Sequence, residues 1–258
     1  MTTPKPASKP QAAATPAITV PSATPASPKR ASAADRIARQ FGGPDGPMGH
    51  LVTWLLARGN ASFNRWLVHE LGTVIAPPAT VVELGCGPGI ALAELLSAYP
   101  AARVIGVDPS AIVLTSARRR NRPAIADGRL TLVTGDTATA ASYAPASLVL
   151  ACHVLYFWPD PVRELQRIRQ IVAPAGHIAL GYQLRYHMPP LAQRTFPRQG
   201  FTLYDCDDQV AAALEQAGFT RPEVRSFGAP DCPMGRLALS APAPQQQAIN
   251  TATRARQG

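Results

Sequence analysis

The feature that most constrains this chain is a glycine-rich loop between two short apolar runs. Residues 81–89 read VVELGCGPG and residues 104–108 read VIGVD, so an acid, Glu83 or Asp108, stands near the end of each run. Glycine lacks Cβ, so it permits a sharp turn at positive φ and a close approach of the backbone to a ligand. The sequence therefore predicts a strand, a helix and a second strand built around a ligand site.

Apolar runs and helical patterns alternate along most of the chain. The runs predict strands at 80–84, 103–107, 129–133, 147–151, 176–182, 221–227 and 235–240. Amphipathic patterns predict helices at 89–99, 110–120, 137–142, 160–172 and 207–217. This alternation indicates an α/β fold, a three-layer Rossmann-like doubly wound sheet of about seven strands. The last two strands have no helical pattern between them, so we expect the C-terminal strand to be antiparallel to the rest.

The spacing of the glycines separates two kinds of ligand site. A dinucleotide fingerprint has the spacing G-x-G-x-x-G, in which the third glycine lets the helix pack against the strand. Here the glycines are Gly85, Gly87 and Gly89, and residue 90 is Ile. A nicotinamide dehydrogenase is therefore the alternative that the loop alone leaves open.

With Glu83 ahead of it and Asp108 ending the next strand, this loop resembles motif I of the class I S-adenosylmethionine-dependent methyltransferases. The resemblance covers about residues 75–241. It is closest to the small-molecule methyltransferases related to the ubiquinone and menaquinone C-methyltransferases, which share the loop and the helix-opening segment 158–161. It implies S-adenosylmethionine as cofactor and a small-molecule acceptor, and neither motif identifies that acceptor or an oligomeric state.

The resemblance also implies roles for polar residues at the strand ends. Asp108 would accept hydrogen bonds from the ribose hydroxyls, Asp136 would contact the adenine amine, and Glu83 would orient the amino-acid end of the cofactor. For Asp108 and Asp136, capping of the following helix is the structural alternative. The predicted cofactor-binding residues are Glu83, Gly85, Cys86, Gly87, Gly89, Asp108, Pro109, Asp136, Thr137 and Cys152.

In the resembled family, the exit of the strand 147–151 lines the methyl-transfer site, so the resemblance implies that site here. This exit reads HVLYFW over residues 153–158 and lacks the NPPY or DPPY run typical of enzymes that methylate nucleobase amines or glutamine amides. His153 is a candidate general base with a pKa near neutrality, or else a structural histidine. Tyr156 is the second catalytic candidate, with aromatic packing as its alternative.

Composition divides the chain into a core and two tails. Residues 1–34 are rich in Pro and Ala and hold no acid, so a disordered basic tail is expected there, and residues 242–258 predict a second tail. The methyltransferase domain is expected at 35–241. Within it, 35–72 predicts two amphipathic helices that pack against the core, with a membrane-surface anchor as the alternative. Residues 184–206 predict either a substrate lid, whose arginines suit a carboxylate or phosphate, or a solvated connection.

The positive charge does not by itself indicate nucleic acid. The chain carries a formal net charge of +9, but much of the excess lies in the tails, at Lys5, Lys9, Lys29, Arg30, Arg254 and Arg256. A nucleic-acid partner is therefore not expected. An RNA methyltransferase that uses the basic tails remains one alternative function, and a non-catalytic S-adenosylmethionine-binding protein is the other.

Cysteine usage and hydropathy indicate the cellular compartment of the protein. The four cysteines form no C-x-x-C pair, so neither a disulfide framework nor a metal site is expected. No apolar run reaches the roughly 18 residues of a membrane-spanning helix, and the first thirty residues lack a signal-peptide core. We therefore expect a cytoplasmic enzyme that transfers a methyl group to a small molecule, largely by positioning the reactants.

Overall fold

The computed structural model describes residues 46–229 and 232–244 of this chain. The strands are β1 (Thr80–Leu84), β2 (Arg103–Asp108), β3 (Leu130–Thr134), β4 (Ala146–Cys152), β5 (Val172–Tyr182), β6 (Glu223–Ala229) and β7 (Cys232–Ser240). The α-helices are α2 (Gly46–Val74), α3 (Ile90–Ala98), α4 (Ala111–Arg120), α5 (Arg122–Ala126), α6 (Thr137–Ala140), α7 (Pro161–Ile171), α8 (Pro190–Thr195) and α9 (Asp207–Gln216). Short 3-10 turns are η1 (Ala141–Tyr143), η2 (Leu155–Phe157), η3 (Arg185–His187) and η4 (Pro197–Gln199).

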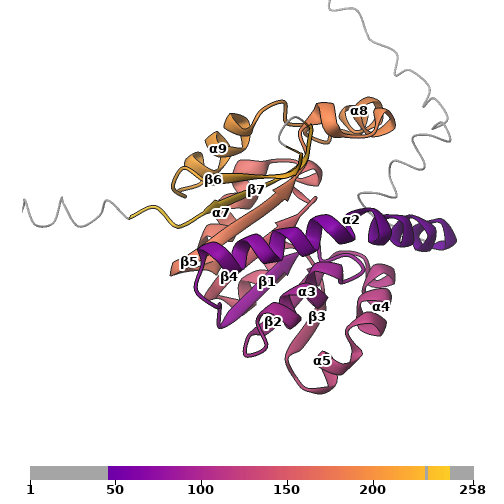
Figure 1. The fold of residues 1–258 in the computed structure, drawn as a ribbon, viewed down its shortest axis with the longest axis vertical. Helices are drawn as coiled ribbons and strands as arrows, with labels where there is room; N and C mark the ends of the chain where they lie inside the picture. Colours follow the sequence, from indigo (N-terminus) through magenta and orange to yellow (C-terminus); the bar gives the residue numbers. More distant parts are fainter. Residues whose placement is uncertain (1–45, 230–231, 245–258) are drawn as a thin grey trace, which may run out of the picture. The chain divides into compact units, whose positions relative to one another are not determined.

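The strands form one seven-stranded sheet in the order β3-β2-β1-β4-β5-β7-β6 (Figure 1). The first five strands pair in parallel, with Val82 of β1 opposite Ile105 of β2 on one side and Val149 of β4 on the other. Strand β7 runs antiparallel to both β5 and β6. This confirms the predicted Rossmann-like sheet with its antiparallel C-terminal strand.

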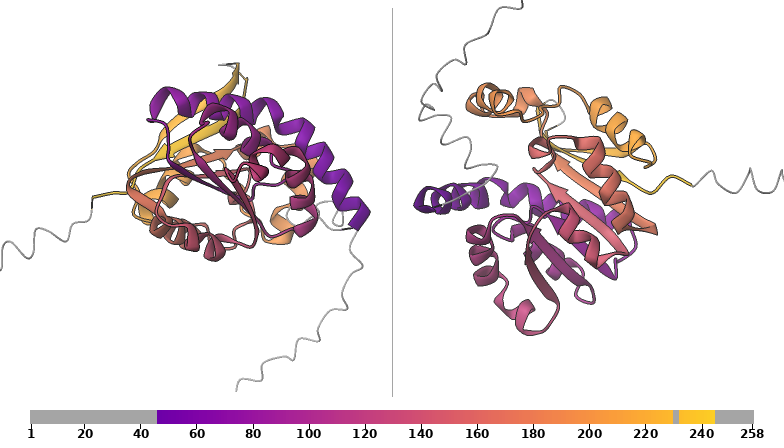
Figure 2. Two further views of the ribbon diagram at one scale, coloured as in Figure 1. Left: turned by 90° about the horizontal axis from the view of Figure 1, so that it is seen from below. Right: turned by 180° about the vertical axis from the view of Figure 1, so that it is seen from behind.

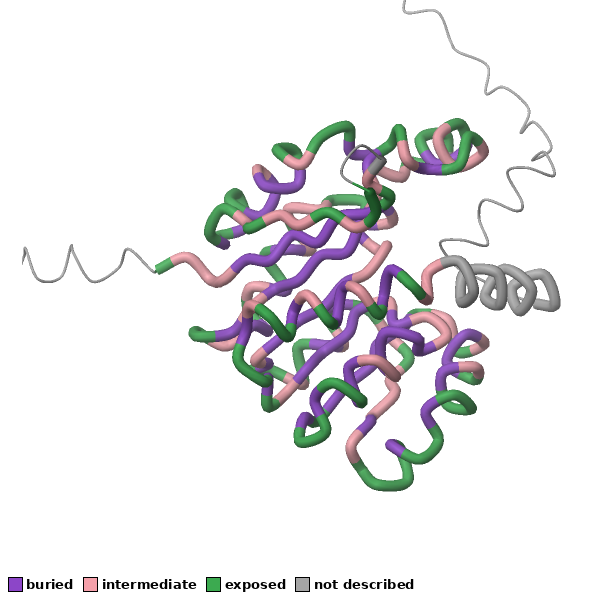
Figure 3. Tube along the Cα trace, viewed as in Figure 1, coloured by how far each residue is buried: buried purple, intermediate pink, exposed green. Residues whose placement is uncertain are grey.

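Helices cover both faces of the sheet (Figure 2). On one face α2, α3 and α4 bury side chains such as Leu67, Leu92 and Leu114 against the strands. On the other face α6, α7 and α9 do the same with side chains such as Ile168 and Leu214. Because both faces are covered, β1, β2 and β4 are buried along most of their length (Figure 3), as continuous apolar strands of a parallel sheet require.

The prediction of two helices before the first strand was wrong for the part that the structure describes. Helix α2 runs without a break from Gly46 to Val74, so Gly59 lies inside one continuous helix. A glycine inside a helix costs only about 1 kcal/mol. The burial of side chains such as Leu67 and Leu71 against the sheet outweighs that cost. Residues 35–45 of the predicted pair lie outside the described residues.

Other segments went unrecognised in the sequence or lie outside the description. Helix α5 was not predicted, and the predicted lid 184–206 contains η3, α8 and η4. The predicted tail 1–34 and residues 245–258 of the second tail are not described. None of the described helices combines the length and the hydropathy needed to cross a membrane.

Candidate functional site

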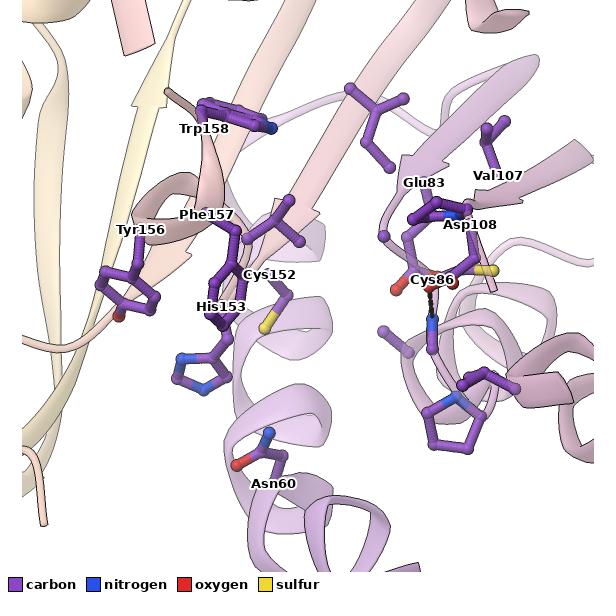
Figure 4. Close-up of a pocket in the computed structure, with 18 of the residues that line it drawn as sticks. Asn60, Glu83, Cys86, Val107, Asp108, Cys152, His153, Tyr156, Phe157 and Trp158 are labelled. Atoms are coloured by element: carbon purple, nitrogen blue, oxygen red, sulfur yellow. Dashed lines mark hydrogen bonds between the residues drawn. The ribbon is translucent and has the colours of Figure 1, made fainter. Parts of the chain in front are cut away.

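A cavity of about 590 Å³ opens at the carboxyl ends of the central strands. Strands β1 and β4 are neighbours at this point of the sheet. After β1 the chain continues to β2 on one side, and after β4 it continues to β5 on the other side, so the strand order reverses between β1 and β4. Such a crevice is where open α/β sheets bind their ligands. Figure 4 shows one wall formed by the glycine loop and the end of β2, and the facing wall formed by the exit of β4.

Two names describe these walls. The glycine side is formed by lining residues from the ends of β1, β2 and β3: Glu83, Leu84, Gly85, Cys86, Gly87, Pro88, Val107, Asp108, Pro109, Gly135, Asp136 and Thr137. The aromatic side comprises Asn60, Asn64, Cys152, His153, Val154, Tyr156, Phe157, Trp158, Pro159, Gln183, Met188, Pro189, Leu191, Ala192, Thr195 and Phe196. All residues predicted to bind the cofactor line the cavity except Gly89.

The three loop glycines all have positive φ values, between 53° and 73°. A Cβ at Gly85 would lie 2.5 Å from Cγ2 of Val154, so this glycine lets the glycine side approach the aromatic side. A Cβ at Gly87 would meet nothing nearer than 3.9 Å, so the space before it is open to a ligand. Gly89 lies behind the cavity as the N-cap of α3, where a Cβ would lie 2.6 Å from Nδ2 of Asn121.

Asp108 connects the glycine loop to the end of β2. Its Oδ2 accepts the Gly87 N–H at 2.9 Å, and its Oδ1 accepts the Ser110 N–H at 2.9 Å. The side-chain cap of α4 is Ser110. Burial raises the pKa of Asp108, although the two N–H donors favour the charged form. The carboxylate is thus held at the cavity wall, with lone pairs left for further donors.

Glu83 carries a buried carboxyl oxygen that lacks a partner. The residue is 3% exposed, and its Oε2 has no hydrogen bond within the described part of the chain. Burial, and then the neighbouring Asp108 carboxylate, holds the pKa of Glu83 well above its ordinary value. A carboxyl group in this state is stabilised by any cationic donor that enters the cavity.

Asp136 is the N-cap of α6, in a reciprocal capping arrangement. Its Oδ1 accepts the Thr139 N–H at 3.1 Å, and that hydrogen bond lowers the pKa of Asp136. The capping alternative named for this residue is therefore present in the structure. Asp136 also lines the cavity beside the buried Thr137, and a carboxylate can accept more than one hydrogen bond.

Cys86 and Cys152 contribute thiols with low reactivity. Burial raises the pKa of both thiols, and the Glu83 carboxyl raises them further. The Cys152 thiol donates to Oδ1 of Asn64 at 3.1 Å. Both cysteines are therefore lining groups without thiolate character at neutral pH.

His153 has an unusual backbone and an uncharged ring. Its φ of 56° is in the left-handed region, and its N–H donates to the Gly181 carbonyl at 2.7 Å. The ring lies 4.9 Å from the Phe63 ring, centroid to centroid. Burial lowers the pKa of His153 to about 4, so the expectation of a pKa near neutrality was wrong. The reason is that burial penalises the imidazolium and no carboxylate of the described residues compensates.

Tyr156 is fixed by the chain itself. Its hydroxyl accepts the Gln183 N–H and donates to the Gln183 carbonyl at 3.3 Å. Burial raises the pKa of Tyr156 far above its ordinary value. This hydroxyl therefore ties the exit of β4 to the end of β5 and stays protonated at neutral pH.

The predicted lid 184–206 reaches the cavity through apolar side chains. Met188, Leu191 and Phe196 are among its lining residues. Its three arginines do not line the cavity, and Arg185 pairs with Asp205 at 2.9 Å. The lining of this cavity therefore does not support the prediction that these arginines suit a carboxylate or phosphate on the acceptor.

Two lining residues, Asn60 and Asn64, were missed in the sequence. Both come from α2, one helical turn apart, and thus share a face of that helix. Neither amide nitrogen makes a hydrogen bond within the described part of the chain. The signal was present in the sequence, as two carboxamides four residues apart beside the apolar stripe of Phe63 and Leu67.

The chain matches known proteins over most of this region. A family model described as a methyltransferase domain matches residues 56–223. The trans-aconitate 2-methyltransferase of Methylobacterium nodulans is 32% identical over 153 residues, which are 59% of this chain and 54% of that protein. The chain spans about half the length of the curated relatives that it matches first.

Solved structures share the fold at low sequence identity. A putative O-methyltransferase from Nostoc punctiforme superposes with a TM-score of 0.64 at 16% identity, over 81% of this chain and 67% of that chain. CalO1, a methyltransferase in calicheamicin biosynthesis in its SAH-bound form, gives 0.58 at 18% identity, over 71% of this chain and 54% of that chain. Since the family model covers more than half of the sequence, the chain belongs to the class I S-adenosylmethionine-dependent methyltransferases.

Proposed function

We propose that this protein transfers a methyl group from S-adenosylmethionine to a small-molecule acceptor. The observation that carries the proposal is the two-sided cavity, whose glycine side combines open backbone, Asp108 and the unpartnered Glu83. Its size is that of a site for small molecules.

The glycine side fits this cofactor in its chemistry. Glu83 would pair with the cofactor's ammonium group, which supplies the donor that Oε2 lacks. Asp108, already positioned by two N–H groups, would accept the ribose hydroxyls. Asp136 and Thr137 would contact the adenine. Gly85, Cys86, Gly87 and Pro109 would lie along the cofactor, Gly89 would shape the loop from behind, and Cys152 would border the reacting end.

When bound, S-adenosylmethionine supplies a methyl group on a positively charged sulfur, already activated for displacement. The chain's task is then to hold the acceptor in line with that group and to exclude water. Positioning of this kind contributes roughly 7 to 11 kcal/mol to catalysis. The aromatic side, with Phe157, Trp158 and the lid segment, would perform both tasks.

His153 and Tyr156 would act as positioning groups. An imidazole with a pKa of about 4 is a weak base at neutral pH, yet it still accepts or donates a hydrogen bond. Tyr156 would hold the β4 exit in place through its two hydrogen bonds to Gln183. An acceptor that needs little proton removal suits this pair best.

A small molecule is favoured over RNA by the charge of the cavity. Among the described lining residues, the ionisable carboxyls are Glu83, Asp108, Asp136 and Glu164, and no Lys or Arg is present. Such a lining repels phosphate. The cysteines that the structure describes, Cys86, Cys152 and Cys206, are all free thiols, which suits the reducing cytoplasm that we propose as the compartment.

The test uses the full chain with methyl-labelled S-adenosylmethionine and a metabolite extract. We expect label in a small molecule and equimolar S-adenosylhomocysteine. Cofactor binding without any labelled product would support the non-catalytic binder instead. Label in RNA that disappears when residues 1–34 and 242–258 are deleted would support the RNA alternative.

A further inference from the structure

Charge is distributed unequally between the two sides of the cavity. Three carboxyl groups, those of Glu83, Asp108 and Asp136, line the glycine side. The aromatic side, as far as the structure describes it, has no acidic or basic side chain other than His153. Glu164 also lines the cavity, and its carboxylate is paired with Arg167.

The polar groups of the aromatic side are all neutral at physiological pH. Asn60 and Asn64 present carboxamides, and the His153 ring is uncharged because its pKa is lowered to about 4. Asn64 is 7% exposed, and its amide oxygen already accepts the Cys152 thiol while its amide nitrogen makes no hydrogen bond in the described chain. This amide nitrogen is therefore available to donate to a ligand oxygen or nitrogen that enters the cavity.

The remainder of the aromatic side is apolar. Rings of Phe157 and Trp158 come from the β4 exit, and side chains of Met188 and Leu191 come from the predicted lid. The Phe157 ring packs edge-on against the Phe201 ring, with centroids 5.0 Å apart, which fixes its orientation. Apolar walls with a few hydrogen-bonding groups bind apolar molecules and use the polar groups for orientation.

We propose that the acceptor is an uncharged, mostly apolar molecule that presents a hydrogen-bonding oxygen or nitrogen to the Asn60 and Asn64 amides. This inference rests on the proposed methyl transfer. A carboxylate or ammonium on the acceptor would lose its hydration against this side without gaining an opposite charge. The acceptor would then differ in charge from trans-aconitate, a tricarboxylate.

Separation of the acceptor pool by charge tests the inference. A metabolite extract is divided by ion exchange at pH 7 into anionic, neutral and cationic pools, and each pool is incubated with the full chain and methyl-labelled S-adenosylmethionine. We expect label in the neutral pool, and neither label in trans-aconitate nor a saturable rise in Tm when it is added with S-adenosylhomocysteine. Label confined to the anionic or cationic pool, or turnover of trans-aconitate, would overturn the inference while leaving methyl transfer intact. Absence of label from every pool would overturn methyl transfer itself.

A cation placed in the aromatic side provides the second test. Asn60→Arg should lower kcat/KM for the labelled neutral acceptor by about tenfold or more and leave the Kd for S-adenosylmethionine little changed. His69→Arg adds the same charge on an exposed part of α2 and should leave acceptor turnover unchanged. If Asn60→Arg weakens cofactor binding and spares the acceptor KM, Asn60 belongs to the cofactor site and the inference is wrong.

Discussion

The two sides of the cavity are built in different ways. The glycine side comes from the ends of three neighbouring strands, and backbone geometry and buried carboxyls define it. The aromatic side combines α2, the β4 exit, the end of β5 and the segment that follows it. The first lies within one continuous stretch of the chain, residues 83–137, and the Gly87–Asp108 hydrogen bond joins its loop to β2, whereas the second depends on packing between segments far apart in sequence.

This difference explains why a methyltransferase sequence identifies its donor more readily than its acceptor. A site formed from one loop and the ends of three neighbouring strands keeps its sequence pattern wherever the fold occurs. A site assembled from distant helices and loops can change any contributor independently. Substitutions in the glycine side, in the aromatic side and at the contact between them should therefore have different effects on cofactor binding, catalysis and stability.

The largest effect is expected where the two sides touch. Gly85→Ala places a Cβ 2.5 Å from Val154 at a φ of 63°, so one side must shift. A shift near 1 Å lowers catalysis about 100-fold, to be read as kcat/KM in the labelled-donor assay. Gly128→Ala is the control, because Gly128 has a φ of 71° with nothing within 4 Å of its Cβ position. Equal losses in the two variants would assign the effect to backbone strain alone.

A smaller effect should distinguish ligand contact from helix capping. Asp136 and Asp160 each cap a helix by accepting the N–H three residues on, so replacement of either by Ala should cost about 1 kcal/mol of stability. Only Asp136→Ala should also raise the Kd for S-adenosylmethionine, by about tenfold. Calorimetric titration of both variants is the measurement, and unchanged affinity in Asp136→Ala would leave that residue as a cap alone.

The neutral state of His153 predicts a dependence of stability on pH. Its folded pKa of about 4 is below the ordinary value of 6.5, so the unfolded chain binds the proton more readily between these values. The stability that neutral His153 contributes to the folded protein is therefore complete above pH 6.5 and is lost as the pH falls toward 4. At pH 5 this loss should be about 1 kcal/mol in the free energy of unfolding, after allowance for partial exposure of the ring. Denaturant unfolding of His153→Gln at pH 7.5 and 5 should show a smaller loss than the wild type. An equal loss would show that the folded pKa of His153 lies close to its unfolded value, so that burial does not lower it.

The smallest effect is expected for the Tyr156 hydroxyl. Tyr156→Phe removes the tie to Gln183 and should cost about 1 kcal/mol in the free energy of unfolding, with kcat little changed. Tyr182→Phe is a matched control, since its hydroxyl donates to Asp207 at 2.7 Å and does not line the cavity. A collapse of kcat in Tyr156→Phe alone, with cofactor affinity retained, would make Tyr156 a catalytic residue.

The sequence was most informative where structure follows from local pattern. The seven strands could be predicted from apolar runs, and the antiparallel closing strand from the missing helical pattern between the last two runs. The continuity of α2 through Gly59 could not, because tertiary packing decides whether a helix tolerates a glycine. The low pKa of His153 could not be predicted either, because it depends on burial by neighbours such as Phe63 that are distant in sequence.

The central claim is that the glycine side binds S-adenosylmethionine. Calorimetric titration of the wild type, Asp108→Ala and Gly87→Val tests it most directly, because Asp108 and Gly87 are joined by a hydrogen bond in the cavity wall. We predict saturable binding at one site per chain in the wild type, and a loss of at least about 1.4 kcal/mol, or tenfold in Kd, in each variant. Binding at wild-type strength in both variants would contradict the account.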